Sequence, residues 1–251
     1  MPHGPLAHLW LELLAYAVGA QWYRLNVRRS PPSVARPAPL QRWAVVAGAL
    51  FGAAVGSKLL YVLQYLPALM NEPALTWWSG KTIAGGLLGG LVGVEVAKSA
   101  TGWRLSTGDA FVAPLLAGIV IGRLGCQLAG LEDLTYGGVT NLPWGWDYGD
   151  GLRRHPVALY EALALLLLAG ALSASRARLA RVSGDRFRAF MVCYLLLRIA
   201  LDFLKPPHTP PAPGLLVPAL YGPLTAIQWA CVAGLAYYLP TLGRWLKNDV
   251  R

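Results

Sequence analysis

The sequence predicts an all-α integral membrane protein with seven transmembrane helices, and three observations lead to this fold class. Hydrophobic residues make up 55% of the 251 residues, only 14% are charged, and the mean hydropathy is +0.45. The apolar residues gather in runs near the roughly 20 residues that cross a bilayer core. The basic residues, which give a formal net charge of +10, fall mostly between these runs. Such clusters orient membrane proteins, so we expect no nucleic-acid partner.

Seven apolar stretches set the limits of the predicted helices. The first has no lysine or arginine before it, which is typical of a retained helix and not of a cleaved signal peptide. We expect the whole chain, residues 1–251, to form a single transmembrane domain. The predicted helices cover residues 7–24, 42–66, 82–100, 108–127, 155–174, 187–204 and 217–240.

Basic loops alternate with less basic loops along the chain, and this alternation predicts the orientation. Lysine and arginine are concentrated after the first, third and fifth predicted helices and in the C-terminal tail. Because cytoplasmic loops carry such an excess, we expect the N-terminus outside and the C-terminus in the cytoplasm. Segment 128–154, named the outer loop from here on, is then expected to lie outside, and it is long and rich in glycine, tryptophan, aspartate and tyrosine. Long loops are usually functional, so we expect it to form part of the site.

Glycines recur at four-residue intervals in two predicted helices. The second helix carries Gly48, Gly52 and Gly56, and the third carries a similar series within residues 85–93. This spacing lets two helix backbones approach closely. We therefore expect these glycines to serve packing.

Two arginines lie near the outer ends of predicted helices, where a charge needs a partner. Arg123 has no acidic residue at helical spacing, whereas Arg198 lies four residues before Asp202 on the same helix face. For Arg198 and Asp202, an ion pair within the helix and a ligand-binding role both remain open. Planar, permanently charged guanidinium groups suit phosphate oxygens. We expect Arg123 to bind an anionic phospholipid headgroup at the bilayer surface.

The fifth predicted helix begins with a dense polar block. Arg154 and His155 precede Pro156, and Tyr160 and Glu161 follow within the helix. Proline suits a first helical turn, which puts His155 near the N-cap. There a histidine either caps the helix or exchanges a proton, and both roles remain open. Glu161 lies inside the helix, so we expect an arginine of the site as its partner.

Other charged residues carry weaker signals. Lys81, on an outer loop, is expected to contact a headgroup. The Gly80–Thr82 segment does not fit a nucleotide-binding loop, because the first glycine of that motif would fall at Leu75 and no strand precedes it. The histidines, the cysteines and the acidic residues of the outer loop show no metal-ligand spacing. We therefore expect no metal and no organic cofactor.

These motifs together resemble the prolipoprotein diacylglyceryl transferase family. The stretch Gly-Arg-Leu-Gly at residues 122–125, followed by Gly137, is similar to the family's signature. Residues 154–161 resemble its Arg-His-Pro-x-x-Leu-Tyr-Glu block, and residues 198–205 resemble a charged motif of its sixth helix. Gln228 matches a glutamine at the start of its last helix.

The resemblance implies an enzyme of the bacterial cytoplasmic (inner) membrane that uses phosphatidylglycerol and needs no cofactor. It implies transfer of a diacylglyceryl group to the cysteine thiol of a prolipoprotein signal peptide. Arg123 and Arg198 would hold the phosphate and stabilise the leaving glycerol phosphate. His155 or Glu12 would accept the thiol proton. The residues expected to line the substrate site are Gly137, Tyr160, Glu161, Arg154, Glu12, Lys81, Asp202 and Gln228.

Three positions differ from the family's pattern. Ala84 stands where the family has a histidine, Cys126 where it has an asparagine and Leu11 where it has a tyrosine. These differences keep two alternatives open. One is a related phospholipid-using transferase with a different acceptor, and the other is a non-catalytic phospholipid-binding membrane protein. A transporter is a weaker alternative, because no inverted repeat is visible.

Overall fold

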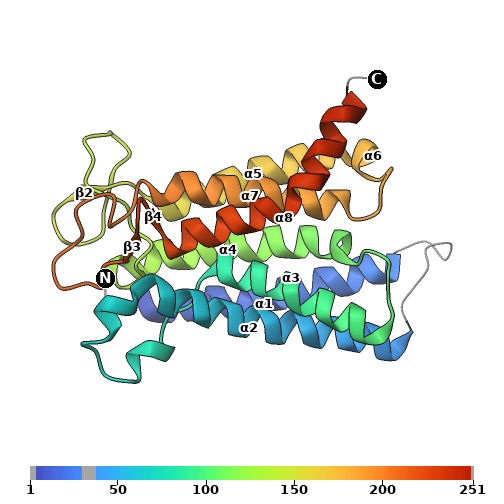
Figure 1. Ribbon diagram of the computed structural model, residues 1–251. Helices are drawn as coiled ribbons and strands as arrows, with labels where there is room; N and C mark the ends of the chain where they lie inside the picture. The colour runs from blue at the N-terminus through green and yellow to red at the C-terminus, as the bar shows by residue number, and fades with distance from the viewer. Residues whose placement is uncertain (1–3, 30–37, 250–251) are drawn as a thin grey trace. The chain divides into compact units, whose positions relative to one another are not determined.

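The computed structural model describes residues 4–29 and 38–249, and α-helices dominate it (Figure 1). A helix occupies most of each of the seven predicted ranges. The α-helices of the described residues are α1 (Gly4–Arg29), α2 (Pro39–Leu69), α3 (Ile83–Thr101), α4 (Val112–Ala129), α5 (Val157–Ala174), α6 (Arg176–Leu179), α7 (Asp185–Asp202) and α8 (Ala226–Asp249).

Short elements connect these helices. Strands β1 (Trp146–Asp147) and β2 (Arg153–Arg154) form one antiparallel pair, and β3 (Leu220–Tyr221) and β4 (Leu224–Thr225) form another. The 3-10 turns are η1 (Thr76–Trp78), η2 (Gly108–Phe111) and η3 (Gly130–Asp133).

The apolar character of the helices identifies a helical membrane protein. Four segments of the described residues are long and apolar enough to span a bilayer: α2, α3, α5 and the stretch Gly108–Asp133 around α4. Large apolar side chains point outward on two of them, for example Phe51 on α2 and Leu167 on α5. Such exposure is stable when lipid is the surrounding solvent. Crossing by α1, α7 and α8, and the orientation, stay predictions.

The helices group into two compact units, and each is described by itself. The first unit holds residues 4–29 and 107–217, and the second holds residues 38–106 and 218–249. In the first unit α1 packs on α4, α4 on α5, and α5 on α7. Asp109 of η2 accepts hydrogen bonds from the Gly184 and Phe187 N–H groups at 2.7 and 2.9 Å. This carboxylate therefore anchors the N-terminus of α7, which is also the end favoured by the helix dipole.

In the second unit the glycine series of α2 and α3 face one another. A Cβ atom on Gly56 would lie 2.5 Å from the Gly85 carbonyl oxygen and 2.8 Å from the Gly89 Cα. The expectation that these glycines serve helix packing is therefore confirmed. Helix α8 packs on both α2 and α3. The buried Gln64 side chain of α2 accepts a hydrogen bond from the Ile227 N–H at 3.0 Å and so anchors α8.

The last helix begins later than predicted. Residues 217–225 carry the β3–β4 hairpin, and α8 begins at Ala226. The turn of this hairpin contains Gly222, whose φ of +69° suits glycine. The run is apolar throughout, so hydropathy alone did not separate strand from helix. The short helix α6 and the strands of the outer loop were likewise not predicted.

Candidate functional site

A buried carboxylate lies at the centre of a charged cluster in the first unit. Glu161, on α5, is only 1% exposed. Its Oε2 lies 2.8 Å from Arg123 Nη2 of α4 and 3.1 Å from Arg198 Nη1 of α7. Its Oε1 accepts a hydrogen bond from the Tyr194 hydroxyl at 3.2 Å. A carboxylate at this depth needs such partners, and three helices supply them.

The charged cluster carries more positive than negative groups. Arg198 Nη2 lies 2.6 Å from Asp202 Oδ1 within α7. Lys205, just after α7, is buried and interacts electrostatically with both arginines and both carboxylates. With all groups ionised, three cations face two carboxylates, which leaves one excess positive charge. The Arg123 Nε is also buried without a hydrogen-bond partner. The cluster therefore suits an anion that accepts hydrogen bonds.

These contacts show how the charged residues expected at the site are paired. Arg123 lacks an acidic neighbour on its own helix, as its sequence shows, but pairs with Glu161 of another helix. Glu161 has the arginine partner that was expected. Arg198 and Asp202 form the ion pair within the helix, and Arg198 also reaches Glu161. A ligand-binding role for Arg198 stays a prediction.

His155 belongs to a polar network at the start of α5. Its Nδ1 lies 3.3 Å from the Tyr160 hydroxyl, which accepts a hydrogen bond from Trp144 Nε1 at 2.9 Å. A Cβ atom on Gly137 would lie 2.6 Å from the His155 Cβ, so only glycine allows this close approach. Pro156 occupies the N-cap without a side-chain capping bond. The capping role considered for His155 is therefore wrong, because the helix begins after it.

Tyr148 connects the outer loop to α4 and to the polar network of His155. The sequence did not predict this residue as part of the site. Its hydroxyl donates a hydrogen bond to Gln127 Oε1 at 3.0 Å, one turn beyond Arg123 on α4. It also interacts electrostatically with Tyr160 and Cys126. Burial raises the pKa of Tyr148 to about 12, so it stays a neutral hydroxyl at physiological pH. Only the aromatic content of the loop hinted at such a contact.

Arg154 stabilises the outer loop. This β2 residue is 1% exposed, and its Nε and Nη2 donate to Asp150 Oδ2 at 2.9 and 2.6 Å. Its guanidinium carbon lies 5.3 Å from the centre of the Tyr136 ring. Burial alone would raise the pKa of Asp150, but the hydrogen bond and charge of Arg154 and the Leu152 N–H lower it. Arg154 thus holds the backbone that carries His155.

Three further residues that were expected at the site, Glu12, Lys81 and Gln228, are described within the unit to which each belongs. Glu12 of α1 accepts a hydrogen bond from the Tyr16 hydroxyl at 2.6 Å. Lys81, which is exposed, and Gln228 belong to the second unit. Gln228 is buried, and its Oε1 and N–H exchange hydrogen bonds with Thr225 at 2.9 and 3.2 Å. This reciprocal pair is a capping box, so Gln228 fixes the start of α8.

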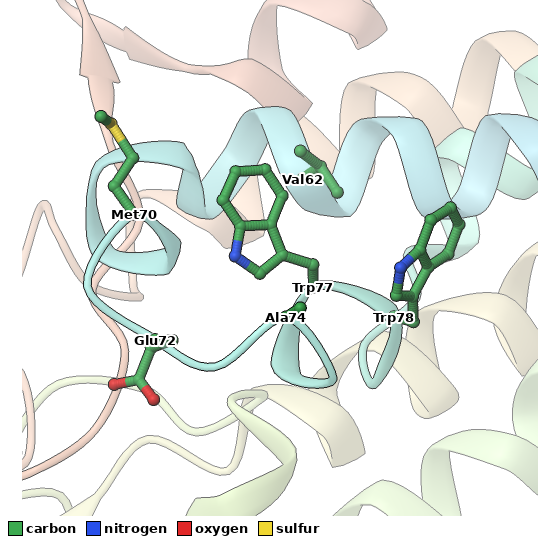
Figure 2. A pocket seen from close by; sticks show the side chains of 6 residues that line it. All are labelled: Val62, Met70, Glu72, Ala74, Trp77 and Trp78. Carbon is green, nitrogen blue, oxygen red and sulfur yellow. The ribbon is translucent and has the colours of Figure 1, made fainter.

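The second unit contains a pocket between α2 and the loop around η1. Its volume is about 400 Å³, and Figure 2 shows two indole rings beside α2 and the Glu72 carboxylate pointing away from them. Lys58 secures this loop by donating to the Gly80 carbonyl at 2.8 Å and to the Trp78 carbonyl. The lining residues are Val62, Met70, Glu72, Ala74, Trp77 and Trp78. With no basic side chain in that lining, the pocket is not suited to a phosphate.

Comparisons with known proteins agree with the resemblance. The family model described as prolipoprotein diacylglyceryl transferase matches residues 11–242. A phosphatidylglycerol–prolipoprotein diacylglyceryl transferase of Solidesulfovibrio magneticus is 35% identical over 221 residues, covering 81% of this chain and 79% of the relative. The enzyme of the same description from Nitratidesulfovibrio vulgaris (strain Miyazaki F) is 34% identical over 257 residues, covering 97% and 89%. That of Rhodospirillum rubrum is 34% identical over 222 residues, covering 81% and 78%.

Proposed function

Because the chain belongs to the prolipoprotein diacylglyceryl transferase family, we propose that it transfers the diacylglyceryl group of phosphatidylglycerol to the cysteine thiol of a prolipoprotein signal peptide. The observation that carries this proposal is the buried cluster of Arg123, Glu161 and Arg198, with its excess positive charge. A phosphodiester carries one negative charge and would neutralise that excess.

The arginines would act on the phosphate in two stages. In the bound lipid, guanidinium donors that do not face Glu161, including Arg123 Nε, would bind the phosphate oxygens. During transfer the sulfur forms a bond to the glyceryl carbon, and the bond from that carbon to the phosphate oxygen breaks. Glycerol phosphate leaves with a second negative charge. Preorganised cations stabilise charge that develops at this point, so the cluster would lower the barrier.

The thiol must lose its proton to become a good nucleophile. We assign this proton to His155, whose Nδ1 lies in the network with Tyr160 and Trp144. Glu12, the other expected base, is already the acceptor of the Tyr16 hydroxyl. The outer loop would hold this network in place through the Arg154–Asp150 pair.

The location follows from the same proposal. The protein would lie in the bacterial cytoplasmic membrane with seven crossings, and the site would open near the outer surface. Support comes from the alternation of basic loops and from the outer ends of α4 and α7, where Arg123 and Arg198 lie. Both substrates carry acyl or apolar segments and would enter from the lipid.

The decisive experiment uses the purified protein in vesicles of phosphatidylglycerol with a lipobox peptide. We expect glycerol phosphate release together with lipidation of the peptide. Arg123→Ala and Arg198→Ala should lower the rate by about 10²–10³, the usual cost of removing an oxyanion donor. Arg188→Ala is the matched control, because Arg188 pairs with Asp185 at the opposite end of α7.

Two results would contradict the proposal. Release of glycerol phosphate without peptide lipidation would point to a different acceptor, an outcome that the departures at Ala84 and Cys126 make worth testing. Retention of bound lipid with no release would show a phospholipid-binding protein.

A further inference from the structure

Three side chains with metal-binding donors meet beside the charged cluster of the first unit. His8 comes from α1, Cys126 from the last turn of α4 and Asp133 from η3. One donor atom of each lies within 4.8 Å of the others. His8 Nε2 is 3.8 Å from Asp133 Oδ1 and also 3.8 Å from Glu12 Oε2. Because His8 is far in the chain from Cys126 and Asp133, sequence spacing gave no sign of this group.

Two polar atoms of this group lack hydrogen bonds. His8 Nδ1 and Asp133 Oδ2 are both buried without a partner in the described structure. Buried polar atoms are normally satisfied, and leaving one unpaired costs free energy. The side chains of His8 and Asp133 are nonetheless 22% and 18% exposed, which leaves a path for an ion. The Cys126 thiol is hydrogen-bonded to the Asp133 side chain, and a bound cation would take the place of the proton in that bond. The cation would also use the lone pairs of the two unpartnered atoms.

The charge and softness of the donors select the class of cation. A thiolate and a carboxylate carry two negative charges, and a neutral imidazole adds none, so a divalent ion would be balanced. Sulfur and imidazole nitrogen suit zinc-class ions, whereas magnesium and calcium prefer oxygen ligands. The fourth ligand would be water, which keeps this charge balance.

We propose that His8, Cys126 and Asp133 form a binding site for a divalent cation of the zinc class. Binding forms a sulfur–metal bond and releases the thiol proton to solvent. The site would tie α1 to the end of α4. It would also stand next to the phosphate-binding arginines, because Arg123 Nη1 lies 3.8 Å from Cys126 Sγ. Its proposed role is to position these elements, and it takes no part in the transfer step.

The test uses the full-length protein in detergent, stripped with a chelator and titrated with Co²⁺. We expect one equivalent to bind, with thiolate-to-cobalt charge-transfer absorption, and Zn²⁺ to displace it. Cys126→Ser should abolish this absorption, and His8→Ala should weaken cobalt binding at least tenfold. Cys193→Ser is the control, because Cys193 is an exposed thiol on α7 of the same unit. Absorption that survives Cys126→Ser, or that Cys193→Ser removes, would overturn the proposal.

A second measurement needs no variant and does not depend on transferase activity. X-ray absorption at the zinc edge of the loaded wild-type protein should show one sulfur at about 2.3 Å beside nitrogen and oxygen scatterers. A shell of nitrogen and oxygen alone, or no retained zinc, would refute the site. Either result leaves the proposed transferase function untouched.

Discussion

At the scale of single residues, Glu161 joins the two arginines of the charged cluster. It is the common partner of Arg123 and Arg198, and all three side chains are buried. Removing one member of such a group leaves the others with uncompensated charge. The same residue therefore balances part of the charge of the two arginines and sets how many guanidinium donors remain for a phosphate.

The first prediction concerns Glu161→Gln, which keeps the shape of the side chain and removes its charge. We expect a loss of about 3–5 kcal/mol in unfolding free energy, as found when buried pairs lose one partner. Thermal unfolding in detergent measures it, and added phosphatidylglycerol should restore part of the loss. Glu95→Gln is the control, because the Glu95 side chain is 48% exposed. An unchanged melting temperature for Glu161→Gln would contradict the central place of this carboxylate.

At the scale of elements, the contact between α2 and α3 depends on the absence of side chains. A methyl group at Gly56 would meet the backbone of α3, whereas one at Gly86 would have its nearest neighbour at 3.8 Å. Backbone atoms do not move aside as a flexible side chain does, so the two helices would have to separate.

We therefore predict opposite effects for two similar substitutions. Gly56→Ala should lower the unfolding free energy by about 1–3 kcal/mol through overpacking. Gly86→Ala should be neutral or stabilising by up to about 1 kcal/mol, since alanine is the better helix former. Melting temperatures of the two variants in the same detergent decide the matter. If both variants were destabilised equally, close helix packing would not be the reason why position 56 is a glycine.

The outer loop gives a prediction about pH. The pKa of Asp150 is lowered in the fold, because the hydrogen bonds and charge of Arg154 outweigh the opposing effect of burial. Its stabilising contribution is therefore present above the unfolded pKa, near 4, and is lost as pH falls through the lower folded pKa. Proteolysis of residues 140–154 should accelerate in that acid range. Asp150→Asn should remove this acid dependence, and a profile identical to wild type would exclude the ion pair as its cause.

At the scale of the whole molecule, the predicted orientation can be tested with a membrane-impermeant thiol reagent on intact cells. In a Cys193→Ser background, Asn141→Cys of the outer loop should react, because this position is exposed. Ser183→Cys, an equally exposed position between α6 and α7, should react only after the membrane is opened. The reverse pattern would show the opposite topology and would move the proposed site to the cytoplasmic side.

The sequence by itself determined the helices, the family and those contacts that depend on local spacing. Long apolar runs favour helices in lipid, and a helix occurs in each of the seven predicted ranges, although α8 begins later than predicted and α6 was not predicted. The pair of Arg198 and Asp202 follows from a four-residue spacing on one helix. The four-residue spacing of the glycines likewise predicted that they serve helix packing.

Only the tertiary structure decided which distant residues meet. Glu161 needed an arginine, but its position alone did not show that α4 and α7 each supply one. The same holds for His8, Cys126 and Asp133, and for the contact of Tyr148 with Gln127. The physical reason is that helical spacing governs contacts within three or four residues. Contacts between segments depend on how whole helices and loops pack, and the sequence pattern does not predict which of them pack together.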